Sequence, residues 1–205
     1  MVRKTKEEAE QTRLNILDAA RQVFTQHGVS RTSLKQIAEE AGVTRGAIYW
    51  HFESKEALFF AMKEQVAVPL LDKITLALND NDTNPIQAIE TFLLGFLETL
   101  ENDQRTRQTL EITSSKCEYV EEFATLLSEQ VKSCQDFISR MEGFYEQASQ
   151  QGLLAANIDP HLAAIETCSF ISGMMKLWLA DHEGNIVRGQ AAELIKQHVR
   201  GKQKA

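Results

Sequence analysis

The residues with the clearest chemical potential lie in one short run, Thr44 to His51, which reads Thr-Arg-Gly-Ala-Ile-Tyr-Trp-His. The guanidinium of Arg45 can donate two parallel hydrogen bonds to O6 and N7 of a guanine in the DNA major groove. Tyr49 can place its ring against a thymine methyl group and its hydroxyl on a phosphate. Gly46 has no side chain, so the backbone can approach a base or a phosphate closely. This combination of residue types predicts sequence-specific contact with DNA.

Polar residues around this run could hold the phosphate backbone. The hydroxyl of Thr44 can cap the following helix and contact a phosphate near the positive end of that helix. Phosphate contacts are also predicted for four flanking residues, namely Ser33, Lys35, His51 and Lys55. His51 could equally well join this region to the next helix.

Residues 33–52 have the pattern of a helix-turn-helix motif, which would position these side chains. Ala38 is small enough for two helices to touch, and Gly42 tolerates a positive φ in the turn. Val43 and Ile48 would fix the second helix on the first. An ordinary corner between two helices would show the same alanine and glycine, but it would not need a surface suited to DNA.

Two aromatic residues of this region are expected in the core rather than on DNA. Phe52 follows Ile48 by four residues, which places both side chains on one helical face. Trp50 is predicted to be buried with them.

Charge is distributed unevenly along the chain. The net charge is −7, yet residues 1–62 hold nine Lys and Arg against eight Asp and Glu, whereas residues 63–205 hold 13 against 21. This asymmetry predicts a near-neutral head on an acidic body. Arg3, Lys4 and Lys6 could contact phosphates or could form a solvated terminus.

Helical periodicity, capping residues and scarce glycine and proline predict an all-α chain. The first helix should run from about Glu7 to His27, and Ser33 and Thr44 should cap the two helices of the motif. Ser54 should cap a fourth helix from Lys55 to about Leu78. Later helices are expected at about 86–101, 104–116, 119–151, 160–181 and 186–200.

Composition limits the class of protein. Hydrophobic residues form 43% of the chain and charged residues 25%, as in ordinary globular proteins. No apolar stretch reaches the roughly 18 residues of a membrane span, and no apolar segment follows the charged start as in a signal peptide. Three dispersed cysteines without a CxxC pair suit a reducing cytoplasm.

The run Gly42 to Phe52, preceded by Thr12-Arg13, Ile16-Leu17 and Ala20, closely resembles the TetR family of bacterial repressors. The opening Arg-Lys-Thr-Lys-Glu-Glu-Ala and the later Lys116-Cys-Glu-Tyr resemble the branch that controls multidrug efflux pumps. The match is specific over about residues 3–62 and weaker in the body.

This resemblance implies a nine-helix, all-α subunit that forms homodimers. It implies a helix-turn-helix DNA-binding domain over residues 1–60 and a ligand-binding and dimerisation domain over residues 61–205. It also implies a repressor that leaves its operator when a small hydrophobic or cationic compound enters the second domain. The DNA contacts that it implies are Ser33, Thr44, Arg45, Gly46, Tyr49, His51 and Lys55.

The apolar segment from Leu162 to Leu179 predicts a dimer interface. A helix that is apolar around most of its circumference must be buried on two sides. The segments 160–181 and 186–200 of two subunits could form a four-helix interface, whereas a fully intramolecular core is the alternative. Two heads about 34 Å apart would require a near-palindromic DNA site.

A ligand pocket among the body helices should combine apolar walls with a few polar groups. The alternative for each candidate is a plain core position. The apolar candidates are Met62, Val66, Leu70, Phe92, Phe96, Leu110, Phe137, Met141, Met174 and Trp178, and the polar candidates are Glu111, Gln130 and Cys134.

Neither a catalytic residue nor a cofactor or metal site is expected. The sequence lacks the GxSxG, P-loop and HExxH patterns, and its five histidines are scattered. Lys116 could activate the thiol of Cys117, although no base partner is visible. Three alternatives retain DNA binding: a redox-sensing repressor that uses Cys117, Cys134 or Cys168, a repressor of a catabolic operon, and an activator.

Overall fold

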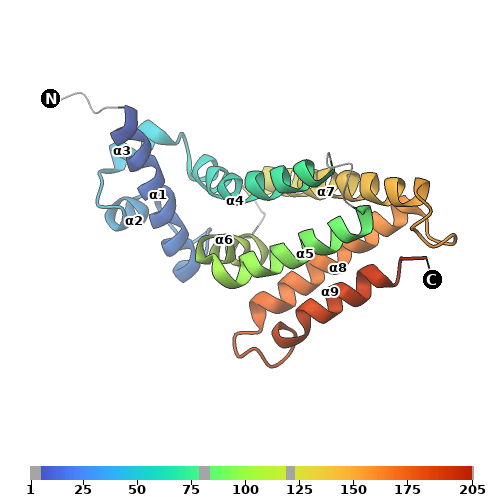
Figure 1. Ribbon diagram of the computed structural model, residues 1–205. Helices are drawn as coiled ribbons and strands as arrows, with labels where there is room; N and C mark the ends of the chain where they lie inside the picture. The colour runs from blue at the N-terminus through green and yellow to red at the C-terminus, as the bar shows by residue number, and fades with distance from the viewer. Residues whose placement is uncertain (1–5, 79–83, 119–122, 205) are drawn as a thin grey trace. The chain divides into compact units, whose positions relative to one another are not determined.

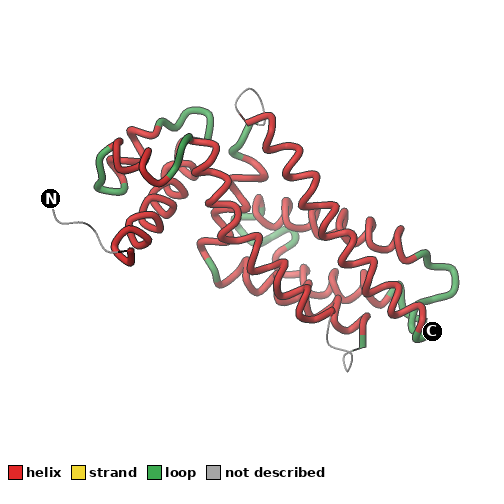
Figure 2. The backbone as a smooth tube through the Cα atoms, turned by 90° about the horizontal axis from the view of Figure 1, so that it is seen from above, coloured by secondary structure: helices red, strands yellow, loops and turns green. Residues whose placement is uncertain are grey.

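The computed structural model describes residues 6–78, 84–118 and 123–204, and these residues are helical with short connections (Figure 1, Figure 2). The helices are α1 Lys6–His27, α2 Leu34–Glu40, α3 Arg45–His51, α4 Lys55–Leu78, α5 Pro85–Asn102, α6 Gln104–Ser115, α7 Ala124–Gln150, α8 Pro160–Ala180 and α9 Ala191–Arg200, with a 3-10 turn η2 at Arg188–Gln190. Within the described ranges there is no extended strand, and the predicted all-α class is confirmed. The predicted start at 119 lies outside the described residues.

Side-chain caps set the beginnings of the short helices. Ser33 accepts a hydrogen bond from the backbone N–H of Gln36 at 3.3 Å, and the Gln36 side chain accepts one from the Ser33 N–H at 2.8 Å. Thr44 accepts a hydrogen bond from the N–H of Ala47 at 3.2 Å. Such caps satisfy N–H groups that have no partner inside the helix. The predicted caps of both motif helices are therefore confirmed.

The described residues pack into two compact units. Of the described residues, the N-terminal unit comprises 6–67, 105–118 and 123–127, and the C-terminal unit comprises 68–78, 84–104 and 128–204. The predicted boundary between residues 60 and 61 falls within α4, and it stays a prediction. The chain leaves the N-terminal unit along α4 and returns to it at the start of α6.

A buried arginine joins three helices of the N-terminal unit. Arg21 on α1 donates to the hydroxyl of Thr109 on α6 at 2.9 Å and to the amide oxygen of Gln65 on α4 at 2.8 Å. It also pairs with Asp18, whose other oxygen accepts from Arg105 at 3.0 Å. A buried charge is tolerated only when it is paired and hydrogen-bonded. These contacts fix α1 against α4 and α6.

The helix α8 supplies much of the core of the C-terminal unit. Of the described helices, it alone has the length and apolar composition that could also cross a membrane. Several of its residues are buried inside the unit, among them Ala164, Thr167 and Trp178. Its apolar composition thus fits a core helix on the side that faces the unit, while other residues of α8 remain exposed.

The loop after α8 explains an error in the predicted start of the last helix. The carboxylate of Asp181 accepts backbone N–H bonds from the four successive residues 185–188, at 2.9 to 3.1 Å. Burial alone would raise the pKa of Asp181, but these four donors outweigh it and lower the pKa to about 2. They hold this segment as a loop, so α9 begins at Ala191 and the predicted start at 186 is wrong.

A chain of polar side chains joins α7, α8 and α9 inside the C-terminal unit. The hydroxyls of Tyr145 and Thr167 lie 2.8 Å apart, and Thr167 lies 2.9 Å from Nε2 of His198. The imidazole also stacks on the ring of Phe170 with centroids 4.2 Å apart. Burial, helped by the ammonium of Lys202, lowers the pKa of His198 to about 4. His198 is therefore neutral at pH 7.

This shift predicts a loss of stability in mild acid. Between pH 6.5 and 4 the unfolded chain binds a proton at His198 that the folded chain rejects, so the free energy of unfolding should fall with pH in this window. Urea unfolding at constant protein concentration, followed by circular dichroism, measures it. His198→Gln removes the titrating group and should show a smaller decline. Equal declines in the two proteins would contradict the assigned pKa.

Candidate nucleic-acid interface

The helices α2 and α3 meet through small and branched apolar residues. Ala38 and Ile48 are both buried, and the N–H of Val43 donates to the carbonyl of Ala38 at 3.0 Å across the turn. Gly42 in that turn has a φ of +65°, which glycine adopts without steric cost. The helix-turn-helix geometry predicted from these residues is present.

Most of the predicted DNA-contact residues lie around one hollow in the N-terminal unit. The hollow has a volume of about 470 Å³ and is bordered by α2, α3 and the start of α4. Five of its lining residues were predicted: Ser33, Lys35, Arg45, Tyr49 and Lys55. The other five, which sequence analysis missed as part of this surface, are Thr32, Leu34, Glu53, Ser54 and Glu56.

Arg45 and Tyr49 form an exposed pair on α3. An Nη of Arg45 donates to the Tyr49 hydroxyl at 2.9 Å, and the guanidinium lies 5.4 Å from the centre of the Tyr49 ring. The two residues are one helical turn apart, so their side chains meet on the same face. An exposed pair of this kind is weakly held, and its donors can turn to a nucleic acid. Thr44 and Gly46 are also exposed at the start of α3.

The remaining predicted contacts differ in how firmly they are held. Lys35 is exposed and lies 3.6 Å from Glu39 in an ion pair that contributes little to stability. His51 is half-buried, and its ring meets that of Trp50 edge-on with centroids 4.5 Å apart. Lys55 donates to the carbonyls of Val29 and Thr32 at 3.3 and 3.2 Å. Lys55 therefore also fixes the loop before α2, a role that sequence analysis missed.

The predicted burial of Trp50 is wrong. Its side chain is 72% exposed, whereas Phe52 is 5% exposed and Ile48 is fully buried. The reason is the helical period of about 3.6 residues, which turns position 50 away from the face shared by positions 48 and 52. The indole is therefore part of the outer surface of the motif.

The surroundings of Cys117 disfavour the thiolate that the open alternative of an activated thiol would require. Burial raises the pKa of Cys117 to about 11, and the nearby Lys63 and Lys55 do not compensate for it. The ammonium of Lys116 instead contacts the carbonyl of Thr25 at 2.7 Å and Glu111 at 3.0 Å. A protonated, half-buried thiol is a poor nucleophile.

A larger cavity of about 670 Å³ lies in the C-terminal unit between α4 and α5. Leu70, Phe92 and Phe96 form its apolar side, and the side chains of Lys73 and Glu98 border it as well. Of the residues predicted to bind the ligand, only these three line the cavity.

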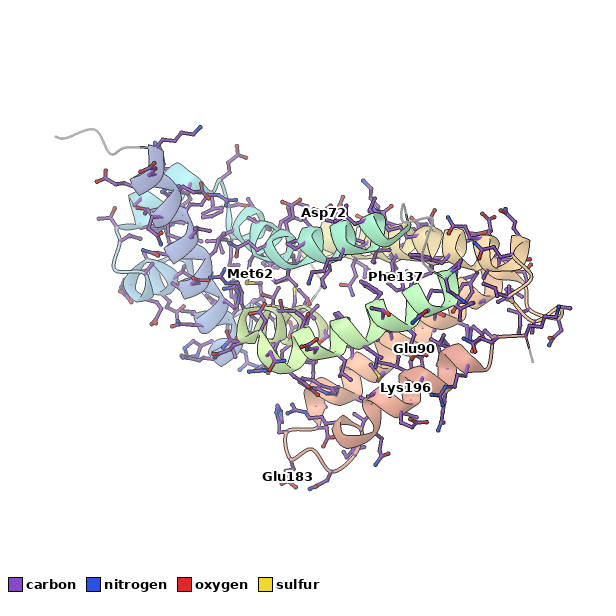
Figure 3. The ribbon with its side chains drawn as sticks, in the orientation of Figure 1. Met62, Asp72, Glu90, Phe137, Glu183 and Lys196 are labelled. Carbon is purple, nitrogen blue, oxygen red and sulfur yellow. The ribbon has the colours of Figure 1, made fainter. Side chains whose placement is uncertain are left out.

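The other candidates for ligand binding are distributed over both units. Phe137, which Figure 3 labels, lies on α7 with its ring 6.1 Å from that of Phe92. Trp178 Nε1 and Gln130 Oε1 are buried and have no hydrogen-bond partner in the described part of the chain. Met141, Met174 and Cys134 also belong to the C-terminal unit, whereas Met62, Val66, Leu110 and Glu111 belong to the N-terminal unit. Their ligand role stays a prediction.

Comparison with known proteins gives matches over nearly the whole chain. Residues 16–62 match the model for bacterial regulatory proteins of the tetR family, and residues 84–202 match the C-terminal region of MAATS-type transcriptional repressors. The HTH-type transcriptional regulator AcrR of Shigella flexneri is 38% identical over 196 residues, which cover 95% of this chain and 91% of AcrR.

Two groups of solved structures share this fold. NalD, the secondary repressor of the MexAB-OprM multidrug efflux pump in Pseudomonas aeruginosa, is 31% identical with a TM-score of 0.84, covering 97% of this chain and 99% of NalD. SmeT, the repressor of the Stenotrophomonas maltophilia pump SmeDEF, was solved with triclosan. That complex is 29% identical with a TM-score of 0.85, covering 95% of this chain and 92% of SmeT.

The exposure of Trp50 predicts that its removal leaves the fold intact. Trp50→Ala should change the free energy of unfolding by less than about 0.5 kcal/mol, because an exposed side chain away from special features contributes little. Phe52→Ala should cost about 3–5 kcal/mol, because it leaves a cavity in the core. Urea unfolding of both variants tests the contrast, and equal losses would contradict the assigned burial.

Proposed function

Because the chain belongs to the TetR family of bacterial regulatory proteins, which regulate transcription and are not enzymes, we propose that it is a ligand-responsive repressor of a multidrug efflux operon. NalD and SmeT, two repressors of multidrug efflux pumps that it resembles over most of its length, support the efflux assignment. The single observation that carries DNA binding is the hollow where Arg45, Tyr49 and Lys55 converge. A repressor of this kind acts in the cytoplasm.

The chemistry of that hollow suits a DNA duplex. Arg45 reads a guanine, and Tyr49 contacts a thymine methyl group or a phosphate. Ser33, Lys35 and Lys55 hold phosphates on either side. Thr44, Gly46 and His51 complete the contact surface along α3. The acidic Glu53 and Glu56 at the edge repel misplaced phosphates and so restrict how the duplex can lie.

The repressor acts as a dimer through α8 and α9. Exposed residues of α8 form one stripe of apolar and small side chains, namely Leu162, Ile165, Ser169, Gly173, Leu177 and Ala180. Leu194 of α9 is exposed as well. Apolar side chains along a helix stripe are stable when a partner covers them. Gly173 has open space where a Cβ would stand, which lets a partner helix approach closely.

The signal is a small hydrophobic compound that binds in the C-terminal unit. The cavity between α4 and α5 has the size that drug-like ligands occupy, and Phe92 and Phe96 give it an apolar side. The triclosan complex of SmeT supports this class of compound.

Arg45→Ala should weaken binding to the operator by about 1–3 kcal/mol and relax sequence preference at one base pair of each half-site. Fluorescence anisotropy with duplexes from upstream of the gene measures affinity, and base substitutions measure preference. Arg45→Lys is the matched control, because it retains the charge and the salt dependence but loses the bidentate contact. Unchanged operator affinity in Arg45→Ala would refute this assignment of the reading helix.

Phe96→Ala should impair the response to ligand and leave DNA binding unaltered. The phenyl ring of half-buried Phe96 would be covered by the bound ligand, and losing that contact costs about 1.5–3 kcal/mol, so release of the operator should need at least about tenfold more triclosan. Leu76→Ala, at an exposed position of α4, is the control and should respond like the wild type. If triclosan released both variants equally, the ligand would bind elsewhere.

A further inference from the structure

The carboxyl end of α6 is hydrogen-bonded to the carboxyl end of α1. The ammonium of Lys116, just beyond α6, contacts the carbonyl of Thr25 at 2.7 Å. Thr25 lies in the last turn of α1, where carbonyls have no partner inside the helix and the helix dipole favours a cation. Glu111 holds the same ammonium at 3.0 Å, which limits where it can move.

The backbone of Lys116 makes a second link to the loop that follows α1. Its carbonyl accepts a hydrogen bond from the N–H of Val29 at 2.9 Å. Gly28, the preceding residue, has a φ of +78°, and a Cβ there would lie 3.5 Å from the same carbonyl. Both backbone features bring the end of α6 close to this loop.

The same residue of the loop, Val29, is held through its carbonyl by a residue of the DNA-contact surface. The carbonyl of Val29 accepts a hydrogen bond from the ammonium of Lys55 at 3.3 Å. Lys55 lines the hollow together with Thr32, whose carbonyl it also holds, and Ser33. Lys116 does not line the hollow. Two successive hydrogen bonds, from the Val29 N–H to Lys116 and from Lys55 to the Val29 carbonyl, connect it to the hollow.

From these contacts we propose that Lys116 is a positioning residue for DNA binding. This inference rests on the proposed function. The side chain of Lys116 fixes the end of α6 on the carbonyl of Thr25, and this places its backbone carbonyl to hold the following loop at the N–H of Val29. The loop in turn holds Lys55 and Ser33 where they meet phosphates. Lys116 itself does not touch the duplex. The residue directly follows α6, the helix on which the chain returns from the C-terminal unit.

Lys116→Met, which keeps the length of the side chain but removes the ammonium, tests this role. Its operator affinity should fall at least about threefold, while the slope of log affinity against log salt should equal that of the wild type. A lost phosphate contact would instead lower the slope by about one. Hydrogen exchange at the Val29 amide should be faster in the variant.

Three controls separate positioning from general effects. Lys116→Arg keeps a cationic donor and should restore affinity to within about twofold of the wild type. Lys132→Met removes the same charge at an exposed site of α7 in the C-terminal unit and should bind DNA like the wild type. Circular dichroism shows whether Lys116→Met is folded. If the variant does not fold, hydrogen exchange at the Val29 amide of the wild type is measured with and without operator in its place. This exchange should slow when DNA binds.

The inference would be overturned if the operator affinity of Lys116→Met were within twofold of the wild type, or if the salt slope of this variant were reduced by about one. An equal loss of operator affinity in Lys116→Arg would overturn it as well. So would an unchanged exchange rate at the Val29 amide when the wild type binds DNA. A wild-type chain that binds no duplex from its own upstream region would overturn the proposed function and this inference together. Binding by the wild type with an unaffected Lys116→Met would overturn this inference alone.

Discussion

The close contact of α3 with α2 is the constraint on which the rest of the binding surface depends. Because Ala38 is small and Ile48 is fully buried, α3 can lie against α2 in one rotational setting. That setting turns Arg45 and Tyr49 outward together. A larger residue at position 38 would move α3 and change the direction of every side chain on its outer face. The polar chemistry of the motif is therefore fixed by an apolar contact.

Features governed by neighbouring residues could be predicted from the sequence. The caps at Ser33 and Thr44 and the bounds of the motif helices follow from local hydrogen bonds and from helical period. The same holds for the end of α1 at His27 and for Phe52 in the core. The convergence of Arg45, Tyr49 and Lys55 on one hollow could be foreseen because the motif has a known geometry.

Features governed by distant contacts could not be predicted in this way. The last helix begins late because Asp181 captures backbone N–H groups, and no periodic pattern shows which residue a carboxylate will bind. Trp50 has the composition of a core residue, and only its angular position on α3 exposes it. The contact of Lys55 with the loop before α2 spans more than twenty residues of sequence. The ligand-binding residues were the hardest to select from the sequence, because every helix of the body has apolar residues at helical spacing.

The chain holds two tryptophans, and they sit in opposite surroundings. Trp178 is 2% exposed beneath the guanidinium of Arg188, whereas Trp50 is 72% exposed on the outer side of α3. An indole in water emits at longer wavelength than one in a protein interior, and only the former is readily quenched by iodide. The protein therefore carries two intrinsic optical probes that can be distinguished without labelling, one on its recognition helix and one within its C-terminal unit.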